Sequence, residues 1–374
     1  MHDQKLQLGM WHRPFERNLE EVQQTLKELK TYGIKDLFVE TYFNGQLIYN
    51  SQICLLPKHH FVGTYGMYED DLLKAFIMEG KKEGIRIHAW VENFFVGRFD
   101  QIEETYWYEQ KKTWILINRD QTFLQKNEVN YLFLDPANED VRNYVFSLYE
   151  EMIRLHQGLE SLHLDYIRYP LVYDITPPKI QDDVGYTKVA LDTFIRQHKL
   201  DGHIYDLLTD AHIYRLWCAF KMDIINTFVE KIYRLSQSKT KLSIAIFGDP
   251  KHAQKHKMQD WSAWIEKNMI DLIIPMAYYK DEKRVFEEVS KLYQYVDGRA
   301  KVYAGIAPAY IGCDTDAHYK QLMASKDAKA EGVVMFATQN YLTKHFMGET
   351  NDRKDINLMF KAFMEEGKTN EQMD

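Results

Sequence analysis

The segment LHLDYIRYP at residues 162–170 carries three ionisable side chains at the end of a run that otherwise suits burial. Successive side chains of a β-strand point to opposite faces. Leu162 and Leu164 would therefore share one face, and His163 and Asp165 would share the other. If the leucines contact a layer of helices, the polar face lines the interior of a barrel. Asp165 would then lie at the mouth, where the strand ends.

Seven further short apolar runs alternate with longer segments of helical period, as in parallel α/β folds. The predicted strands cover residues 5–10, 35–40, 85–91, 160–165, 241–247, 271–276, 301–306 and 332–336. The predicted helices cover residues 18–32, 69–83, 139–156, 210–236, 257–268, 282–296, 315–329 and about 351–366. Eight strands and eight helices indicate an α/β protein with a (β/α)₈ (TIM) barrel.

We expect a single barrel domain over residues 1–366, because no linker rich in Pro, Gly or Ser interrupts the pattern, and a flexible tail over 367–374. Two long insertions follow the third and fourth strands. Residues 93–138 contain two β-like runs, TWILINR and VNYLFLD, which predict a hairpin. Residues 170–209 contain prolines and a predicted helix at 187–199. Both insertions begin at the barrel face where active sites form, so they can wall a cleft.

Composition narrows the class of protein. The formal net charge of −8 argues against a nucleic-acid-binding surface. The three cysteines have no metal-binding or disulfide spacing, and no apolar run is long enough for a signal peptide or a membrane span. We therefore expect a cytoplasmic protein without membrane contact. The paired histidines and aspartates are adjacent in sequence and so do not share a face of a helix or strand, and we predict no metal. The sequence also lacks a glycine-rich phosphate loop, which argues against nucleotide-dependent chemistry, and we predict no cofactor. The oligomeric state stays open.

Four predicted strands deliver a carboxylate to the same rim, namely Glu40, Glu92, Asp165 and Asp249. Carboxylates held close together repel, so one keeps its proton while another is ionised. Glycoside hydrolysis requires such a pair. We predict Asp165, Glu92 and Asp249 as catalytic candidates and Glu40 as a substrate-binding one. Each acid can instead cap the following helix or pair with a cation, above all Glu40 and Asp249.

Four other polar side chains are candidate substrate contacts: His163, Arg168, His88 and Tyr278. His88 and His163 face the predicted interior and can bind sugar hydroxyls or serve as oriented interior histidines. Arg168 can contact substrate or keep a nearby carboxylate ionised through an ion pair. Tyr278 can line a subsite or pack in the core.

Four segments together resemble the glycosyl-hydrolase-like family 10, whose members are bacterial TIM-barrel enzymes distantly related to the α-amylase and α-galactosidase clans. The segments are GIRIHAWVEN at 84–93, LDPANEDVRNYV at 134–145 leading into LHLDYIRYP, and DLIIPMAYY at 271–279. The resemblance implies hydrolysis of glycosidic bonds with Asp165 as the leading catalytic residue. This family often has a second acid directly after that aspartate, where this chain has Tyr166.

The sequence thus favours a glycosidase acting on an oligo- or polysaccharide, with Asp165 as nucleophile or charge stabiliser and Glu92 or Asp249 as proton donor. A non-catalytic carbohydrate-binding barrel is the alternative, because a fold does not determine a function. A metal-dependent hydrolase is a third possibility. It would require two or more of His88, His163, Glu92 and Asp165 to bind one ion.

Overall fold

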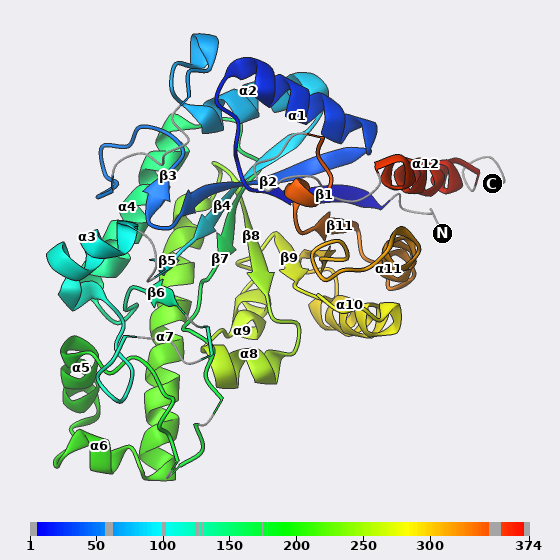
Figure 1. Cartoon of the computed structure of the whole chain (residues 1–374). Coiled ribbons are helices and arrows are strands. Elements are labelled where there is room, and N and C mark those ends of the chain that lie inside the picture. Colours follow the sequence, from blue (N-terminus) through cyan, green and yellow to red (C-terminus); the bar gives the residue numbers. More distant parts are fainter. Residues whose placement is uncertain are drawn as a thin grey trace.

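Eight parallel strands close into a barrel in the computed structural model, which describes residues 6–56, 63–98, 102–123, 127–128, 130–173, 175–177, 179–343 and 353–369 (Figure 1). The barrel strands are β1 (Gln7–His12), β2 (Ile34–Phe43), β4 (Arg86–Glu92), β7 (Ser161–Asp165), β8 (Lys241–Ile246), β9 (Leu272–Pro275), β10 (Lys301–Ile306) and β11 (Gly332–Met335). Each pairs with its neighbour in this order, and β1 pairs with both β2 and β11. The predicted (β/α)₈ fold and all eight predicted strands are confirmed.

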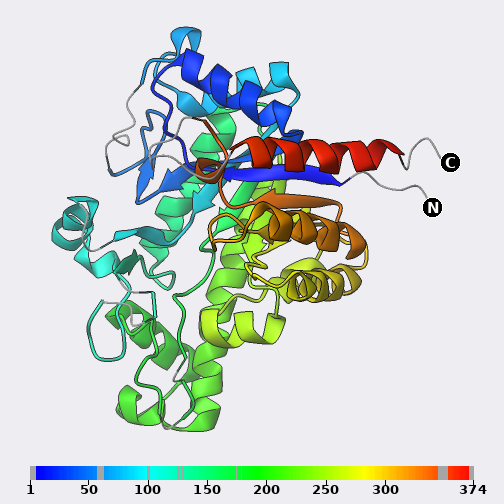
Figure 2. The ribbon, with the colours of Figure 1, turned by 45° about the vertical axis from the view of Figure 1, so that its right-hand side comes forward.

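Helices surround the barrel on its outer side, and Figure 2 shows the same arrangement from a second direction. The long ones are α1 (Leu19–Thr31), α2 (Leu72–Glu83), α4 (Glu139–Leu155), α7 (Ala211–Ser236), α10 (Glu282–Val296), α11 (Thr315–Asp327) and α12 (Arg353–Thr369). The helix predicted over 257–268 is present but shorter, as α9 (Trp261–Glu266), and a further helix that was not predicted, α8 (Pro250–Lys257), precedes it. The chain breaks between them because Met258 is left-handed, with φ of 52°, and Asp260 caps α9.

The predicted alternation of inward and outward side chains is also found. Trp11, Phe38 and Trp90 pack together inside the barrel, in a cluster separate from the larger core between strands and helices. Leu162 and Leu164 belong to that larger core, as their predicted face requires. The barrel interior is therefore aromatic near the mouth, and the strand ends present their polar residues above it.

The insertion after β4 differs from its predicted form. Its two-stranded sheet pairs β5 (Phe95–Arg98) with β6 (Tyr131–Phe133), and α3 (Ile102–Gln110) and a short 3₁₀ helix, η2 (Lys112–Trp114), lie between them. The run TWILINR forms no strand paired with VNYLFLD. It contributes one isolated antiparallel bridge to that run, from Ile115 to Leu134, and another from Asn118 to Val184. The ring of Phe95 lies 4.7 Å from that of Tyr131, and this aromatic contact favours the observed pairing.

The insertion after β7 contains α5 (Lys188–His198), as predicted, and α6 (Ile204–Leu207). Both lie beside the N-terminal half of α7 (Figures 1 and 2). Of the predicted tail, residues 367–369 form the end of α12, and 370–374 fall outside the described residues. Shorter elements complete the chain: β3 (Gln46–Leu47), η1 (Gly66–Tyr68) and η3 (Thr338–Asn340). None of the helices in the described ranges is both long and apolar enough to cross a membrane.

Candidate active site

Three carboxyl groups meet where neighbouring strands β2, β4 and β7 end. Glu92 and Asp165 are paired in the parallel register of β4 and β7, and Glu40 pairs with Trp90 on the other side of β4. Glu40 and Glu92 are buried, with 1% and 3% of their surfaces exposed, whereas Asp165 is partly exposed. Asp165 is therefore the member of this cluster that faces solvent most openly.

Glu40 and Glu92 share a hydrogen bond, which requires one of them to carry a proton. Burial, with the nearby charges of Glu40 and Asp165, raises the pKa of Glu92 well above its ordinary value. Burial also raises the pKa of Glu40, but the guanidinium of Arg13 opposes this shift, and its Nε lies 3.2 Å from Glu40 Oε1. The favoured arrangement is thus a protonated Glu92 that donates to an ionised Glu40.

Asp165 is held by its own surroundings. The indole Nε1 of Trp90 donates to Oδ2 over 3.1 Å, and the backbone N–H of Tyr166 donates to Oδ1 over 2.7 Å. Tyr166 has a φ of 48°, in the left-handed region that non-glycine residues rarely adopt. Burial raises the pKa of Asp165, while these two donors and the positive charge of Arg168 oppose that rise. The donors fix the direction in which its oxygens point.

Aromatic rings and Arg13 surround the carboxyl cluster at the mouth. The Arg13 guanidinium lies 5.7 Å from the ring centre of Trp90 and 5.4 Å from that of Phe336. Phe336 contacts Tyr278 at 5.8 Å and Tyr310 at 5.2 Å between ring centres. Tyr310 is 64% exposed. Partly exposed aromatic rings beside a few polar groups are typical of small-molecule sites.

Two predicted site residues have other partners. Asp249 caps α8 by accepting a hydrogen bond from the His252 N–H over 2.8 Å, which is the alternative expected for a rim acid. Arg168 is buried and forms two hydrogen bonds with the carboxylate of Glu128, at 3.0 and 2.7 Å. Its guanidinium lies 4.7 Å from the ring centre of Tyr166, which brings its positive charge close to Asp165. Neither residue joins the carboxyl cluster.

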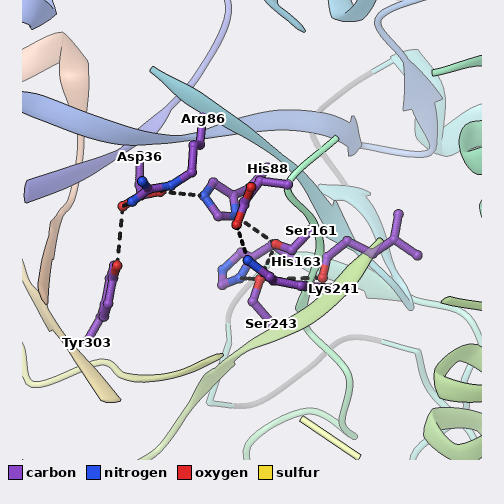
Figure 3. Close-up of polar contacts among 10 residues, drawn as sticks. Asp36, Arg86, His88, Ser161, His163, Lys241, Ser243 and Tyr303 are labelled. Carbon is purple, nitrogen blue, oxygen red and sulfur yellow. Dashed lines mark hydrogen bonds and ion pairs between the residues drawn. The ribbon is translucent and has the colours of Figure 1, made fainter. Parts of the chain in front are cut away.

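The two histidines lie inside the barrel, where a chain of polar contacts engages them (Figure 3). His163 accepts a hydrogen bond from the Trp11 indole at Nε2 and contacts Ser243 Oγ through Nδ1. His88 lies 2.7 Å from Ser161 Oγ and 3.0 Å from Asp36 Oδ1. Both rings are buried, and their nitrogens are occupied by protein partners. The arrangement matches the alternative of oriented interior histidines rather than direct sugar contacts.

A shared metal ion finds no support in this geometry. Within the described ranges, no group of three or more His, Cys, Asp or Glu side chains is arranged to hold one. The ring nitrogens of His88 and His163 already bind Asp36, serines and Trp11. The donor set expected for the metal-dependent alternative is therefore not assembled.

Sequence reasoning found Tyr278 but missed four other residues of the mouth that are not acids. Arg13, Trp90, Phe336 and Tyr310 complete the mouth. Arg13 directly follows the end of β1, so the rule that strand ends carry site residues could have found it. Phe336 follows the end of β11 in the same way. Tyr310 has no such signal, because it lies further along a loop.

The solved structures that resemble this chain include three glycosidases. The catalytic domain of β-amylase from Paenibacillus polymyxa has a TM-score of 0.62 at 10% identity, covering 95% of this chain and 98% of that one. The β-galactosidase from Bacillus circulans sp. alkalophilus has a TM-score of 0.65 at 10% identity, covering 96% and 56%. The β-galactosidase from Marinomonas ef1 has a TM-score of 0.64 at 10% identity, covering 95% of this chain and 59% of that one.

The chain thus spans a whole β-amylase catalytic domain but less than two thirds of the β-galactosidases, and at this identity the likeness concerns the fold alone. No curated protein shows significant sequence similarity to it. The model of the family described as glycosyl hydrolase-like 10 matches residues 10–321, and the chain belongs to that family.

Proposed function

We propose that the protein is a glycoside hydrolase that cleaves O-glycosidic bonds in an oligo- or polysaccharide. The carrying observation is the cluster of Glu40, Glu92 and Asp165. Burial and the neighbouring carboxylates raise the pKa of Glu92 well above its ordinary value, whereas two N–H donors and the charge of Arg168 stabilise the ionised form of Asp165 against its burial. Two carboxyl groups in opposite protonation states are what glycoside hydrolysis requires. Membership of a glycosyl hydrolase-like family supports the same reaction class.

In this proposal Asp165 stabilises or attacks the anomeric carbon, and Glu92 gives its proton to the leaving oxygen. Glu40 and Arg13 are positioning residues, because they hold the proton on Glu92 and form a local ion pair of no net charge. Trp90 and the Tyr166 N–H keep the Asp165 oxygens directed at the substrate. Tyr278, Phe336 and Tyr310 offer the apolar faces on which sugar rings pack.

The test is the substitution Asp165→Asn, which keeps size and removes the charge. Wild-type and variant proteins are incubated with a panel of soluble polysaccharides, and new reducing ends are counted. We expect the variant to lose about 10³-fold or more in rate on any substrate that the wild type cleaves. The matched control is Asp281→Asn, at an exposed helix cap that is equally well formed by asparagine.

A full hydrolytic rate in folded Asp165→Asn protein would refute the catalytic assignment. The binding-only alternative has its own support, because Glu92 is only 3% exposed and Tyr166 stands where relatives often have an acid. Polysaccharide binding by the wild type with no product between pH 4 and pH 9 would favour that alternative.

A further inference from the structure

A cavity of about 410 Å³ opens between the β8–α8 loop, the β9–α10 loop and helices α9 and α10. Its volume lies within the range of small-molecule sites, about 300–1,000 Å³. The polar and aromatic side chains that matter here are Asp249, Trp261, Tyr279, Arg284, Glu288 and Lys291. None of them belongs to the carboxyl cluster at the mouth.

Glu288 has a carboxyl oxygen without a partner. The Tyr279 hydroxyl donates to its Oε2 over 2.6 Å, but its Oε1 is buried and has no hydrogen-bond partner among the described residues. Burial and the nearby charge of Asp249 raise the pKa of Glu288. Because buried polar atoms in native proteins nearly always have partners, this oxygen points to a ligand or an ordered water in the cavity.

Gly248 makes room for that carboxyl group. A Cβ atom at this position would lie 2.5 Å from Glu288 Oε1, so any side chain here would displace that carboxyl group. The glycine thus allows the acid of α10 to reach the β8–α8 loop. The β8–α8 loop and α10 therefore pack closely against each other at the cavity wall.

The charges of the cavity wall nearly balance. Arg284 lies 4.0 Å from the ring centre of Tyr279, and Lys291 is exposed one further turn beyond Glu288. Asp249 uses its Oδ1 to cap α8. Such a wall has cationic donors, carboxyl acceptors and aromatic faces without a strong excess of either charge. A neutral molecule with many hydroxyl groups satisfies this combination better than a strongly charged ligand does.

The cavity adjoins the mouth through one peptide unit. Tyr279 lines the cavity, whereas the preceding residue, Tyr278, contacts Trp11 and Phe336 on the mouth side. On the β8 side, Phe247 packs against Lys257, and Gly248 follows directly in the cavity wall. The same two loops therefore separate the two sites.

The geometry points to this cavity as a second carbohydrate site, which binds one sugar residue outside the mouth. Glu288 Oε1 and Asp249 would bind sugar hydroxyls, Arg284 and Lys291 would donate to ring or hydroxyl oxygens, and Tyr279 would flank the ring. The choice of ligand rests on the proposed glycosidase function. The existence of the site rests on the cavity and its unpartnered oxygen alone.

Binding is measured by saturation-transfer NMR with millimolar glucose, galactose and N-acetylglucosamine. Each of these sugars presents both anomers in solution. The full chain is compared with Glu288→Gln and Arg284→Ala, and with Lys283→Ala as the control, an exposed neighbour on α10 that does not line the cavity. We expect at least one sugar to bind. We also expect about tenfold weaker binding in the two cavity variants and no change in the control.

Binding of none of the three sugars would overturn the proposal. Binding that is lost in Asp165→Asn but unchanged in both cavity variants would also overturn it, because the sugar would then occupy only the mouth. Circular dichroism and thermal melting establish that each variant is folded. Hydrolysis without cavity binding refutes this subsite and leaves the proposed function standing, whereas cavity binding without hydrolysis does the reverse.

Discussion

At the scale of single residues, the candidate site depends on how unequal environments divide protons between similar groups. Glu92 lies beside two other carboxyl groups, and their negative charges disfavour its ionised form and raise its pKa. Asp165 has two N–H donors and partial contact with water. Arg13 neutralises Glu40 and so keeps it from competing for the proton. Two identical glutamates thereby acquire different roles.

The pH dependence of catalysis follows from these shifts. Hydrolysis needs Asp165 ionised and Glu92 protonated, and the pKa values of both lie above their ordinary values. We expect kcat/KM to rise as Asp165 loses its proton and to fall as Glu92 loses its own. The resulting bell-shaped profile of kcat/KM against pH should lie at higher pH than a profile given by two unperturbed carboxyl groups. A pH–rate profile on a cleaved substrate measures it.

Glu92→Gln is the matched variant for that profile. Glutamine cannot titrate, so the fall at high pH should disappear while the rate drops by about 10²–10⁴-fold. The folded protein keeps the Glu92 proton at pH values where the unfolded chain has lost it. Wild-type stability should therefore decline as the pH rises from the unfolded toward the folded pKa, relative to Glu92→Gln. Parallel stability curves across that window would contradict the assigned protonation.

At the scale of elements, one carboxylate joins three segments beside the mouth. Glu128, in the connection between β4 and α4, binds Arg168 and accepts a hydrogen bond from the Leu171 N–H over 2.8 Å. Lys257 at the end of α8 lies 3.8 Å away. Burial alone would raise the pKa of Glu128, but the two cations outweigh it and lower the pKa to about 2. The contact holds the loop that follows Asp165 and β7 against the insertion after β4.

We expect Glu128→Gln to destabilise the protein by about 3–5 kcal/mol, because it leaves the buried guanidinium of Arg168 without a counter-charge. Urea denaturation at pH 7 measures the loss. Since the pKa of Glu128 is lowered, the difference from wild type should shrink as the pH falls from about 4.5 toward about 2.

The control is Lys188→Ala, which removes an ion pair with Asp192 whose two side chains are 87% and 53% exposed. Its cost should stay within about 1 kcal/mol, as for other solvent-exposed pairs. Equal costs for the two variants would mean that Glu128 has no special role in holding the loop.

At the scale of the whole molecule, a line of hydrogen bonds links five strands through the barrel interior, and Figure 3 shows its course from His163 to Asp36. An indole N–H can only donate, so Trp11 requires His163 Nε2 to accept and Nδ1 to carry the proton toward Ser243. Burial lowers the pKa of His163 well below its ordinary value, consistent with a neutral ring. Ser243 forms a hydrogen bond with Ser161, Ser161 forms one with His88, and His88 forms one with Asp36.

Ser243→Ala should break this line and leave the His163 Nδ1–H buried without its acceptor. We expect a loss of about 1–3 kcal/mol in unfolding free energy and a shift of the Trp11 indole resonance in ¹⁵N-labelled protein. The control is Ser147→Ala on α4, whose hydroxyl donates only to the local Tyr144 carbonyl. An unmoved Trp11 signal in Ser243→Ala would mean that the line does not orient the indole.

The period of apolar residues predicted the strands and the inward direction of His88, His163 and Asp165, because period and burial are local properties. The break between α8 and α9 escaped prediction, since it depends on a single left-handed residue, Met258. The hairpin partner within the first insertion depends on aromatic contacts between distant segments, which no local pattern records.

The sequence by itself determined that this chain forms a (β/α)₈ barrel with Asp165 at a strand end, because alternation along a strand decides which side chains face inward. Only the tertiary structure decided which acids meet. Strand register brought Glu40 and Glu92 together with Asp165, whereas the turn into α8 left Asp249 as a helix cap. It also placed Arg13 and the aromatic rings at the mouth, since contacts between chain ends depend on closure of the barrel.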